Sequence, residues 1–230
     1  MVITLRFITL GTALIILSAQ AVTAQEMFRY REFQMGSDLA SVAKLTSTPA
    51  TAAKVIHTRP VDMKDLEWRP RNYSGSASPQ IDPVDMMLFR FYDNQLFKVI
   101  VDYDRRRTEG MSAADMIEAI SATYGPTSEV PSRQFGTPTV KYGFPDTPLA
   151  VWGDADYSVT LLRVAYPAAF RLVVASTRLD ELARTASVSA VRLDTAEAPQ
   201  RERDRQKREA EASSAAQDKA KTENKAQFKP

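Results

Sequence analysis

Residues Met86 to Gly125 read MMLFRFYDNQLFKVIVDYDRRRTEGMSAADMIEAISATYG, and this stretch decides the fold that the sequence predicts. Two runs rich in apolar and aromatic residues flank a polar Asp93-Asn94 step, and a basic connector then leads into a segment with helical spacing. Apolar runs around a short polar step are typical of a β-hairpin, and the periodic segment is typical of an amphipathic helix. The stretch therefore predicts a β-hairpin followed by a helix that packs on the sheet. It indicates no reaction.

The length of the hairpin loop decides which residues share a face of the sheet, because side chains alternate along a strand with period two. A two-residue turn at Asp93-Asn94 would pair Phe89 with Lys98. A loop with an odd number of residues would give one face that carries Met87, Phe89, Phe91, Phe97, Val99, Val101 and Tyr103. The other face would then carry Leu88, Arg90, Tyr92, Leu96, Lys98, Ile100 and Asp102. We favour the odd loop because it separates an apolar face from a mixed one.

The helix that follows has clear signals at both ends. Ser112 is a suitable N-cap, and Asp115 stands three residues later, where the acid of a capping box belongs. Gly125 suits the left-handed position that ends a helix. Ile117 and Ile120 lie on its apolar stripe. We therefore expect these two isoleucines to be buried against the apolar face of the hairpin.

Residues 1–24 have the features of a secretory signal peptide. Arg6 supplies a positive charge, an apolar run follows it, and Val22 and Ala24 place small residues at the positions that precede cleavage. The apolar run is shorter than the roughly 20 residues that cross a bilayer. An uncleaved N-terminal anchor is the alternative. We expect no membrane span after cleavage.

The chain contains no cysteine. This excludes disulfides, zinc sites with thiolate ligands, a cysteine nucleophile and the lipidated cysteine of a bacterial lipoprotein. Together with the signal peptide, it predicts a bacterial protein that is periplasmic or secreted and is stabilised by its core alone.

The charge of the chain is unevenly distributed. Residues 25–194 hold 20 Lys and Arg against 21 Asp and Glu, whereas residues 195–230 hold 9 basic and 7 acidic residues. A nucleic-acid-binding domain would be expected to carry a basic face, so the sequence predicts no nucleic-acid partner. Residues 195–230 lack any large apolar residue before Phe228. We therefore expect this tail to be disordered, or at most a transient solvated helix.

The order of predicted parts recurs along the chain. A helix opens at Gly36, Trp68 follows it, and a hairpin begins near Met86; a second helix opens at Gly110, and Trp152 and a hairpin near Ser158 follow in turn. We interpret this as an internal repeat of an α+β fold. The predicted divisions are a signal peptide at 1–24, a first α-β-β unit at 25–108, a second at 109–194 and the tail at 195–230. Each unit would be a helix packed on its own small antiparallel sheet.

The run GMSAADMIEAISATYGP at Gly110 to Pro126, the strands predicted after it and a fainter echo at Gly36 to Leu45 resemble two groups of exported bacterial proteins. These are the SmpA/OmlA (BamE-like) family and the β-lactamase-inhibitor proteins, and the resemblance covers residues 30–180 by architecture. The segments YREFQMG, VIHTRP and LEWRPR also look like those of secreted bacterial proteins of no established function. The resemblance implies protein binding, often through an exposed sheet face, and no catalysis.

Residues that could carry chemistry are few and dispersed. His57 is the only histidine, and no G-x-S-x-G nucleophile context accompanies it. Asp102 and Asp104, and Asp154 and Asp156, have a spacing that suits a cation, but no glycine and glutamate complete an EF-hand loop. We therefore expect no cofactor, no metal and no catalytic residue. The alternative is a hydrolase of cell-envelope material that uses dispersed acidic residues, with His57, Asp102 or Asp156 converging in one pocket.

The favoured function is an exported, non-enzymatic module that binds a protein or associates with the envelope, its partner being another envelope or secreted protein. Aromatic residues and arginine are the side chains that most often anchor interfaces. The predicted partner surface is therefore the mixed face of the hairpin, represented by Trp68, Leu88, Arg90, Tyr92 and Lys98. The alternative is that the other repeat covers Leu88 and Ile100.

Overall fold

The computed structural model describes residues 28–70, 82–128, 140–141, 144–165, 169–227 and 229. The signal peptide predicted at residues 1–24 lies outside this part of the chain. The elements in chain order are β1 (Arg29–Tyr30), β2 (Phe33–Gln34), α1 (Leu39–Thr46), the short 3-10 helix η1 (Ala50–Ala52), β3 (Lys54–His57), β4 (Met63–Trp68), β5 (Val84–Tyr92), β6 (Gln95–Tyr103), α2 (Ala113–Tyr124), β7 (Val140–Lys141), β8 (Phe144–Pro145), β9 (Thr147–Gly153), β10 (Tyr157–Val164), β11 (Ala169–Ser176) and α3 (Thr177–Gln227).

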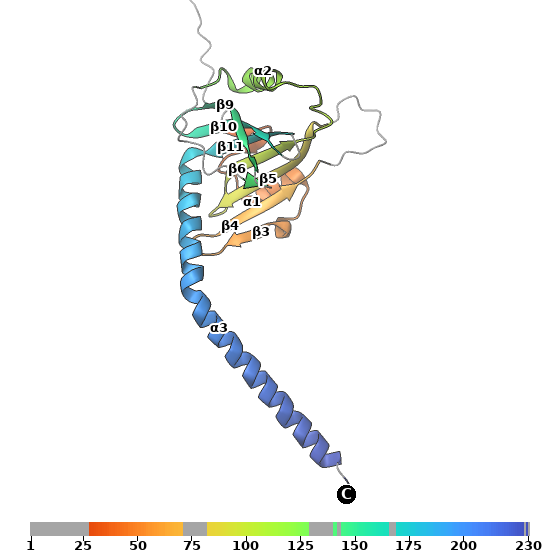
Figure 1. Ribbon diagram of the computed structural model, residues 1–230. Coiled ribbons are helices and arrows are strands. Elements are labelled where there is room, and N and C mark those ends of the chain that lie inside the picture. The colour runs from red at the N-terminus through yellow and green to blue at the C-terminus, as the bar shows by residue number, and fades with distance from the viewer. Residues whose placement is uncertain are drawn as a thin grey trace, which may run out of the picture.

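Seven of these strands form one antiparallel sheet in the order β3-β4-β5-β6-β11-β10-β9 (Figure 1). The prediction of two α-β-β units, each a helix on its own small sheet, is therefore wrong. The two hairpins, β5–β6 and β10–β11, join because β6 pairs with β11, where Val99 lies opposite Val174. Pairing satisfies the backbone groups that a separate small sheet would leave open at its edge. Both strands are then central and almost wholly apolar on one face.

The central hairpin has a two-residue turn, so the predicted odd loop is wrong. Tyr92 pairs with Gln95, and the two turn residues between them have positive φ values, 47° for Asp93 and 59° for Asn94. Asp and Asn tolerate this left-handed conformation better than most residues, and it suits the twist of a tight hairpin.

A β-bulge behind the turn restores the register that the odd loop predicted. Phe91 pairs with Leu96 and Arg90 pairs with Lys98, which leaves Phe97 as an extra residue on β6. A bulge of this kind moves the following side chains by one position. As a result Leu96 takes a place on the apolar face, and Phe97 points to the other side of the sheet.

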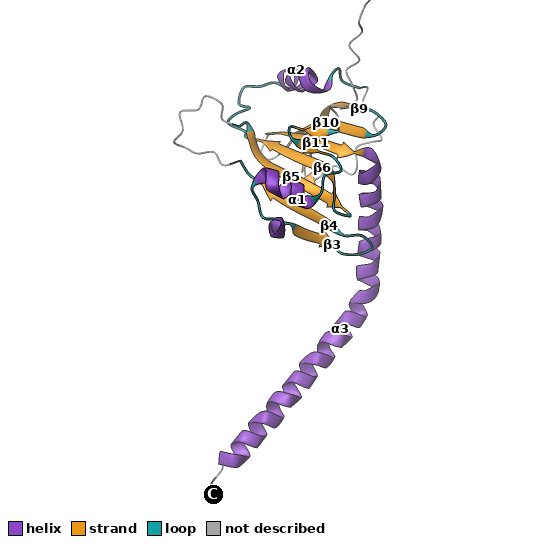
Figure 2. Ribbon diagram, turned by 180° about the vertical axis from the view of Figure 1, so that it is seen from behind, coloured by secondary structure: helices purple, strands orange, loops and turns teal. Residues whose placement is uncertain are grey.

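The first face of the sheet carries the main core. The β1–β2 hairpin, α1 and α2 contribute to this core, and Figure 2 shows α1 in front of the sheet. The Phe33 ring of β2 packs on the Phe89 ring of β5, with 4.5 Å between the ring centroids. The largest side chains that are fully buried on this face are those of Phe33, Leu66, Met87, Phe89, Phe91 and Trp152.

The predicted capping of α2 is confirmed. Ser112 Oγ accepts from the Asp115 backbone N–H, and the Asp115 carboxylate accepts from the Ser112 backbone N–H. Ile120 is buried as expected, and Ile117 is half-buried. The helix lies closest to β9, where Trp152 Nε1 donates to Ser121 Oγ over 3.1 Å. It therefore covers the side of the sheet that β9 forms rather than the central hairpin alone.

The start of α3 packs on the second face of the sheet. Leu179, Ala183 and Ala186 form a small core there with Met63 and with Phe97, the residue of the bulge. Leu179, Ala183 and Ala186 belong to the docked beginning of a helix of 51 residues.

The prediction of a disordered tail is wrong, because α3 continues to Gln227. Residues 199–227 are exposed on all sides of the helix. Ala, Glu, Lys, Arg and Gln are strong helix formers, and pairs such as Lys207–Glu211 and Lys219–Glu223 add modest support at i,i+4 spacing. The lack of apolar residues means that this segment does not pack on a core. It does not prevent the segment from forming a helix, because helix formation depends on local propensity. Within the described residues, no helix combines the length and the apolar character needed to span a bilayer.

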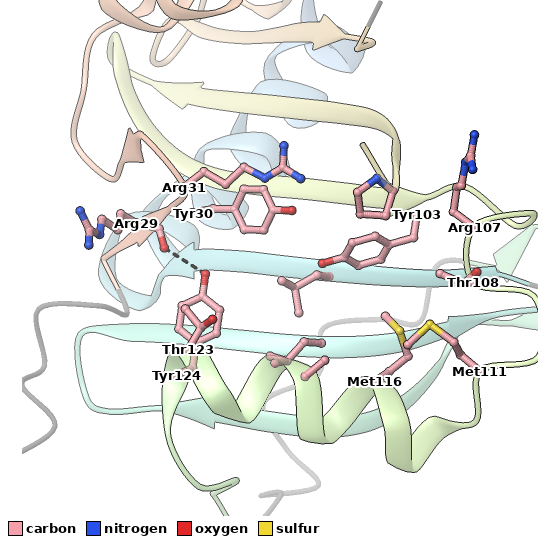
Figure 3. A pocket seen from close by; sticks show the side chains of 14 residues that line it. Arg29, Tyr30, Arg31, Tyr103, Arg107, Thr108, Met111, Met116, Thr123 and Tyr124 are labelled. Atoms are coloured by element: carbon pink, nitrogen blue, oxygen red, sulfur yellow. Dashed lines mark hydrogen bonds between the residues drawn. The ribbon is translucent and has the colours of Figure 1, made fainter. Parts of the chain in front are cut away.

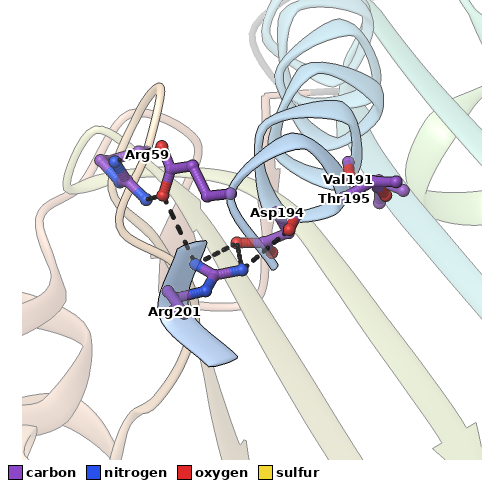
Figure 4. A network of polar contacts seen from close by, with 6 residues as sticks. Arg59, Val191, Asp194, Thr195 and Arg201 are labelled. Carbon is purple, nitrogen blue, oxygen red and sulfur yellow. Dashed lines mark hydrogen bonds and ion pairs between the residues drawn. The ribbon is translucent and has the colours of Figure 1, made fainter. Parts of the chain in front are cut away.

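A bend divides the docked part of α3 from its extension (Figure 1). Pro199 lies inside the helix, where it lacks an N–H and its ring crowds the preceding turn. Arg201 donates to the backbone oxygen of Asp194 over 2.9 Å, and Arg59 forms two hydrogen bonds with Glu197 (Figure 4). The Arg59–Glu197 contact ties the last docked turn to the loop between β3 and β4, whereas the Arg201–Asp194 contact joins the two sides of Pro199 within α3.

Candidate functional site

A concave site lined by described residues lies between α2, β1 and the first face of the sheet (Figure 3). This cavity, called the α2 pocket below, has a volume of about 560 Å³. Its walls include Tyr30 of β1, Tyr103 at the end of β6 and Leu172 of β11. Pockets that hold small molecules usually measure about 300–1,000 Å³, so its size suits a small ligand.

One side of the pocket is apolar because one stripe of α2 faces it. Met116 and Ile120 are four residues apart and therefore share a face of the helix. Ala119 and Thr123 line the pocket from the adjacent, exposed side of the same helix. Met111, just before the N-cap, closes one end with a flexible thioether.

Three tyrosines, together with Thr108 and Thr123, provide the hydroxyl groups of the pocket. Tyr124 Oη donates to the backbone oxygen of Arg29 over 3.1 Å. The hydroxyls of Tyr30 and Tyr103 point toward one another across the pocket (Figure 3). Burial raises the pKa of Tyr30, and it raises the pKa of Tyr103 well above its ordinary value. Both side chains are therefore neutral near pH 7, and the interior of the pocket carries no charge of its own.

Three arginines line the pocket, and no acidic residue is among the described residues that line it. Arg31 is already engaged: its two terminal nitrogens donate to the Asp82 carboxylate over 2.7 and 2.8 Å, and its guanidinium lies 5.4 Å from the centroid of the Tyr30 ring. This hydrogen-bonded pair raises the pKa of Arg31 and lowers the pKa of Asp82. The pair fastens the β1–β2 hairpin, and with it one wall of the pocket, to the chain just before β5.

Replacing Asp82 with asparagine should lower the free energy of unfolding by about 1 kcal/mol at neutral pH. A bidentate ion pair at a half-buried site contributes a stabilisation near the upper end of the range for surface ion pairs. The pKa of Asp82 is lower in the folded chain than in the unfolded one. Its contribution is therefore present above the unfolded value of about 3.9 and is lost as the pH falls through the folded value. Urea unfolding at neutral pH and near pH 3 measures both effects. Glu32→Gln removes an exposed carboxylate from the same hairpin and serves as the control; equal losses for the two variants would contradict the prediction.

The residues of the predicted partner surface fall on both faces of the sheet. Trp68 pairs with Met87 and packs against the main core on the first face. Leu88, Arg90, Tyr92 and Lys98 lie on the second face, away from the α2 pocket. The structure therefore brings four of the five residues together and separates Trp68 from them.

The polar members of that group have partners within the chain. Arg90 Nε donates to the Asp65 carboxylate over 3.1 Å, and Lys98 forms an ion pair with Asp180 of α3. Tyr92 packs beside the small core under α3. Leu88 is half-buried. A partner surface at these residues stays a prediction.

The residues weighed for chemistry lie apart. His57 is on β3, at one edge of the sheet. Asp102 pairs with Arg171 near the start of β11, whereas the Asp156 backbone oxygen accepts from Thr177 at the end of β11. At about 3.3 Å per residue, the length of β11 between these points is roughly 16 Å. Among the described residues, no group of three or more His, Cys, Asp or Glu could hold a metal ion.

Sequence reasoning missed the α2 pocket. The sequence indicates Arg105 to Arg107 only as part of the basic connector that precedes the helix. The available signals were Tyr103, at the end of the predicted apolar face, and the apolar stripe of α2. Nothing in the sequence showed that the β1–β2 hairpin would close the space between them.

No family model, no curated protein and no solved structure matches this chain. The resemblance to the SmpA/OmlA and β-lactamase-inhibitor proteins thus stays a prediction, and the function has to be argued from the site.

Proposed function

We propose that this protein is an exported, non-enzymatic binding module of the bacterial envelope or the secreted fraction, and that its ligand occupies the α2 pocket. The observation that carries the proposal is the pocket itself: about 560 Å³ with an apolar wall, neutral hydroxyls inside and arginines around it. Sites for small molecules combine an apolar lining with a few placed polar groups in this way. The proposal of export rests on the features of residues 1–24.

The lining favours binding over catalysis. The described residues that line the pocket include no His, Asp, Glu, Ser or Lys. The tyrosine and threonine hydroxyls that do line the pocket would need an adjacent base to act as nucleophiles, and the described lining supplies no such base. The hydrolase alternative required His57, Asp102 or Asp156 to converge in one pocket, and none of the three lines this one.

Filling the pocket tests the proposal. Ala119 and Ala122 are both exposed on α2, but only Ala119 lines the pocket. N-phenyl-1-naphthylamine, a neutral fluorescent probe, should bind the purified protein saturably. Ala119→Phe should weaken its binding at least tenfold, because the added ring occupies the space, whereas Ala122→Phe should leave binding unchanged.

Thermal unfolding followed by circular dichroism verifies that both variants are folded. Exposed helix positions tolerate such substitutions within about 0.5 kcal/mol. Absence of saturable binding, or equal affinity in the two variants, would overturn the proposal that the pocket is the binding site.

A further inference from the structure

The α2 pocket is elongated, and its two ends differ from its middle. It follows α2 from Arg29 and Thr123 at one end to Arg107 and Met111 at the other (Figure 3). From Ala113 to Thr123 the helix rises about 15 Å. Between Met111 and Thr123 the apolar wall is formed by Met116 and Ile120, which lie one turn of α2 apart, together with Leu172 of β11. A ligand that fills the pocket is therefore long and apolar over most of its length.

The positive charge of the lining favours a ligand whose ionic group, if it has one, is negatively charged. Its charged members are three arginines, without an acidic residue among the described lining. Arg31 is not available, because the Asp82 carboxylate occupies both of its terminal nitrogens. A buried anion in the middle would face groups that carry no charge, and burying an unpaired charge is costly. An anionic group belongs at an end of the pocket, beside an arginine and in contact with water.

Arg107 is the arginine best placed to receive it. Its side chain is exposed, and no carboxylate of the described residues lies within 4 Å of its guanidinium. The neighbouring Asp104 carboxylate accepts from the backbone N–H groups of Arg106 and Arg107. The run of three arginines from residue 105 gives this end of the pocket a local excess of positive charge.

We propose that the ligand is a single-chain anionic amphiphile, with its acyl chain along Met116, Ile120 and Leu172 and its anionic head at Arg107. This inference rests on the proposed function, since it assigns a ligand class to the same pocket. The head is a carboxylate or a phosphate, the two groups whose geometry suits a guanidinium. A free fatty acid and a lysophospholipid both supply this chemistry.

The test is competition against bound N-phenyl-1-naphthylamine by dodecanoate and by dodecanol, which share a chain and differ in charge. Dodecanoate should bind about tenfold more tightly in about 0.05 M salt, and the preference should shrink in about 0.5 M salt, because screening weakens an exposed ionic contact. Shortening the carboxylate by two methylenes should weaken binding roughly tenfold, since each methylene leaves water on binding. A lysophospholipid with the same chain, compared with dodecanoate, shows which of the two heads the site prefers.

A matched pair of variants locates the head. Arg107→Gln and Arg106→Gln remove the same charge from adjacent exposed residues, but only Arg107 lines the pocket. Arg107→Gln should abolish most of the preference for dodecanoate, because it should weaken dodecanoate binding far more than dodecanol binding. Arg106→Gln should retain the preference.

Three results would overturn the inference: equal binding of dodecanoate and dodecanol, equal effects of the two arginine variants, or affinity that does not depend on chain length. None of these results contradicts the proposed function if the neutral probe still binds the protein and Ala119→Phe still weakens that binding. Failure of the probe itself would instead overturn the proposed function.

Discussion

Replacing Phe89 with alanine should lower the free energy of unfolding by about 3–5 kcal/mol, the usual cost of removing a fully buried aromatic side chain. Phe89 has no exposed surface and lies at the centre of β5. Its ring packs on Phe33 of β2, so the loss would include contacts between the sheet and the hairpin that covers it. Urea unfolding monitored by tryptophan fluorescence and by circular dichroism would measure the change.

Leu88→Ala is the informative comparison for this prediction. Leu88 is the neighbouring residue on β5, but it lies on the second face and is only half-buried. Its loss should cost about 1–1.5 kcal/mol, in proportion to the smaller apolar area removed from water. If the two substitutions cost the same, the assignment of the two faces of the central hairpin would be wrong.

The second large effect concerns the docking of α3. Leu179→Ala should lower the free energy of unfolding by about 2–4 kcal/mol, because Leu179 is 5% exposed and packs with Met63 and Phe97 on the second face. Lys98 and Asp180 form an ion pair across the same interface. The docked turns of α3 are thus expected to belong to the cooperative unit of the sheet.

Leu182→Ala provides a control on the same helix with the same chemistry. Leu182 is 40% exposed, so its truncation should cost less than about 1 kcal/mol. A loss for Leu179→Ala as small as that for Leu182→Ala would show that α3 does not stabilise the sheet.

The α2 pocket shows where sequence reasoning about a site stops. Its residues come from β1, β6, α2 and β11, and they are as far apart in the chain as Tyr30 and Leu172. The apolar stripe of α2 predicted that one face of the helix is buried. The pattern could not show that part of that face borders an open cavity, because burial against a core and burial beside a ligand call for the same apolar residues.

Local sequence patterns were sufficient to predict the cap of α2 at Ser112 and Asp115, the strands of the central hairpin, and the register of that hairpin beyond the bulge. These features depend on residues that are close together in the chain, so short patterns encode them. Tertiary structure alone decided that β6 pairs with β11, that α3 docks through Leu179, and that a bulge turns Phe97 toward that helix. Each of these outcomes depends on a partner that is distant in sequence. A strand edge is satisfied, and an apolar side chain is covered, only when that partner is in place, so the stabilising free energy does not exist before the tertiary structure forms.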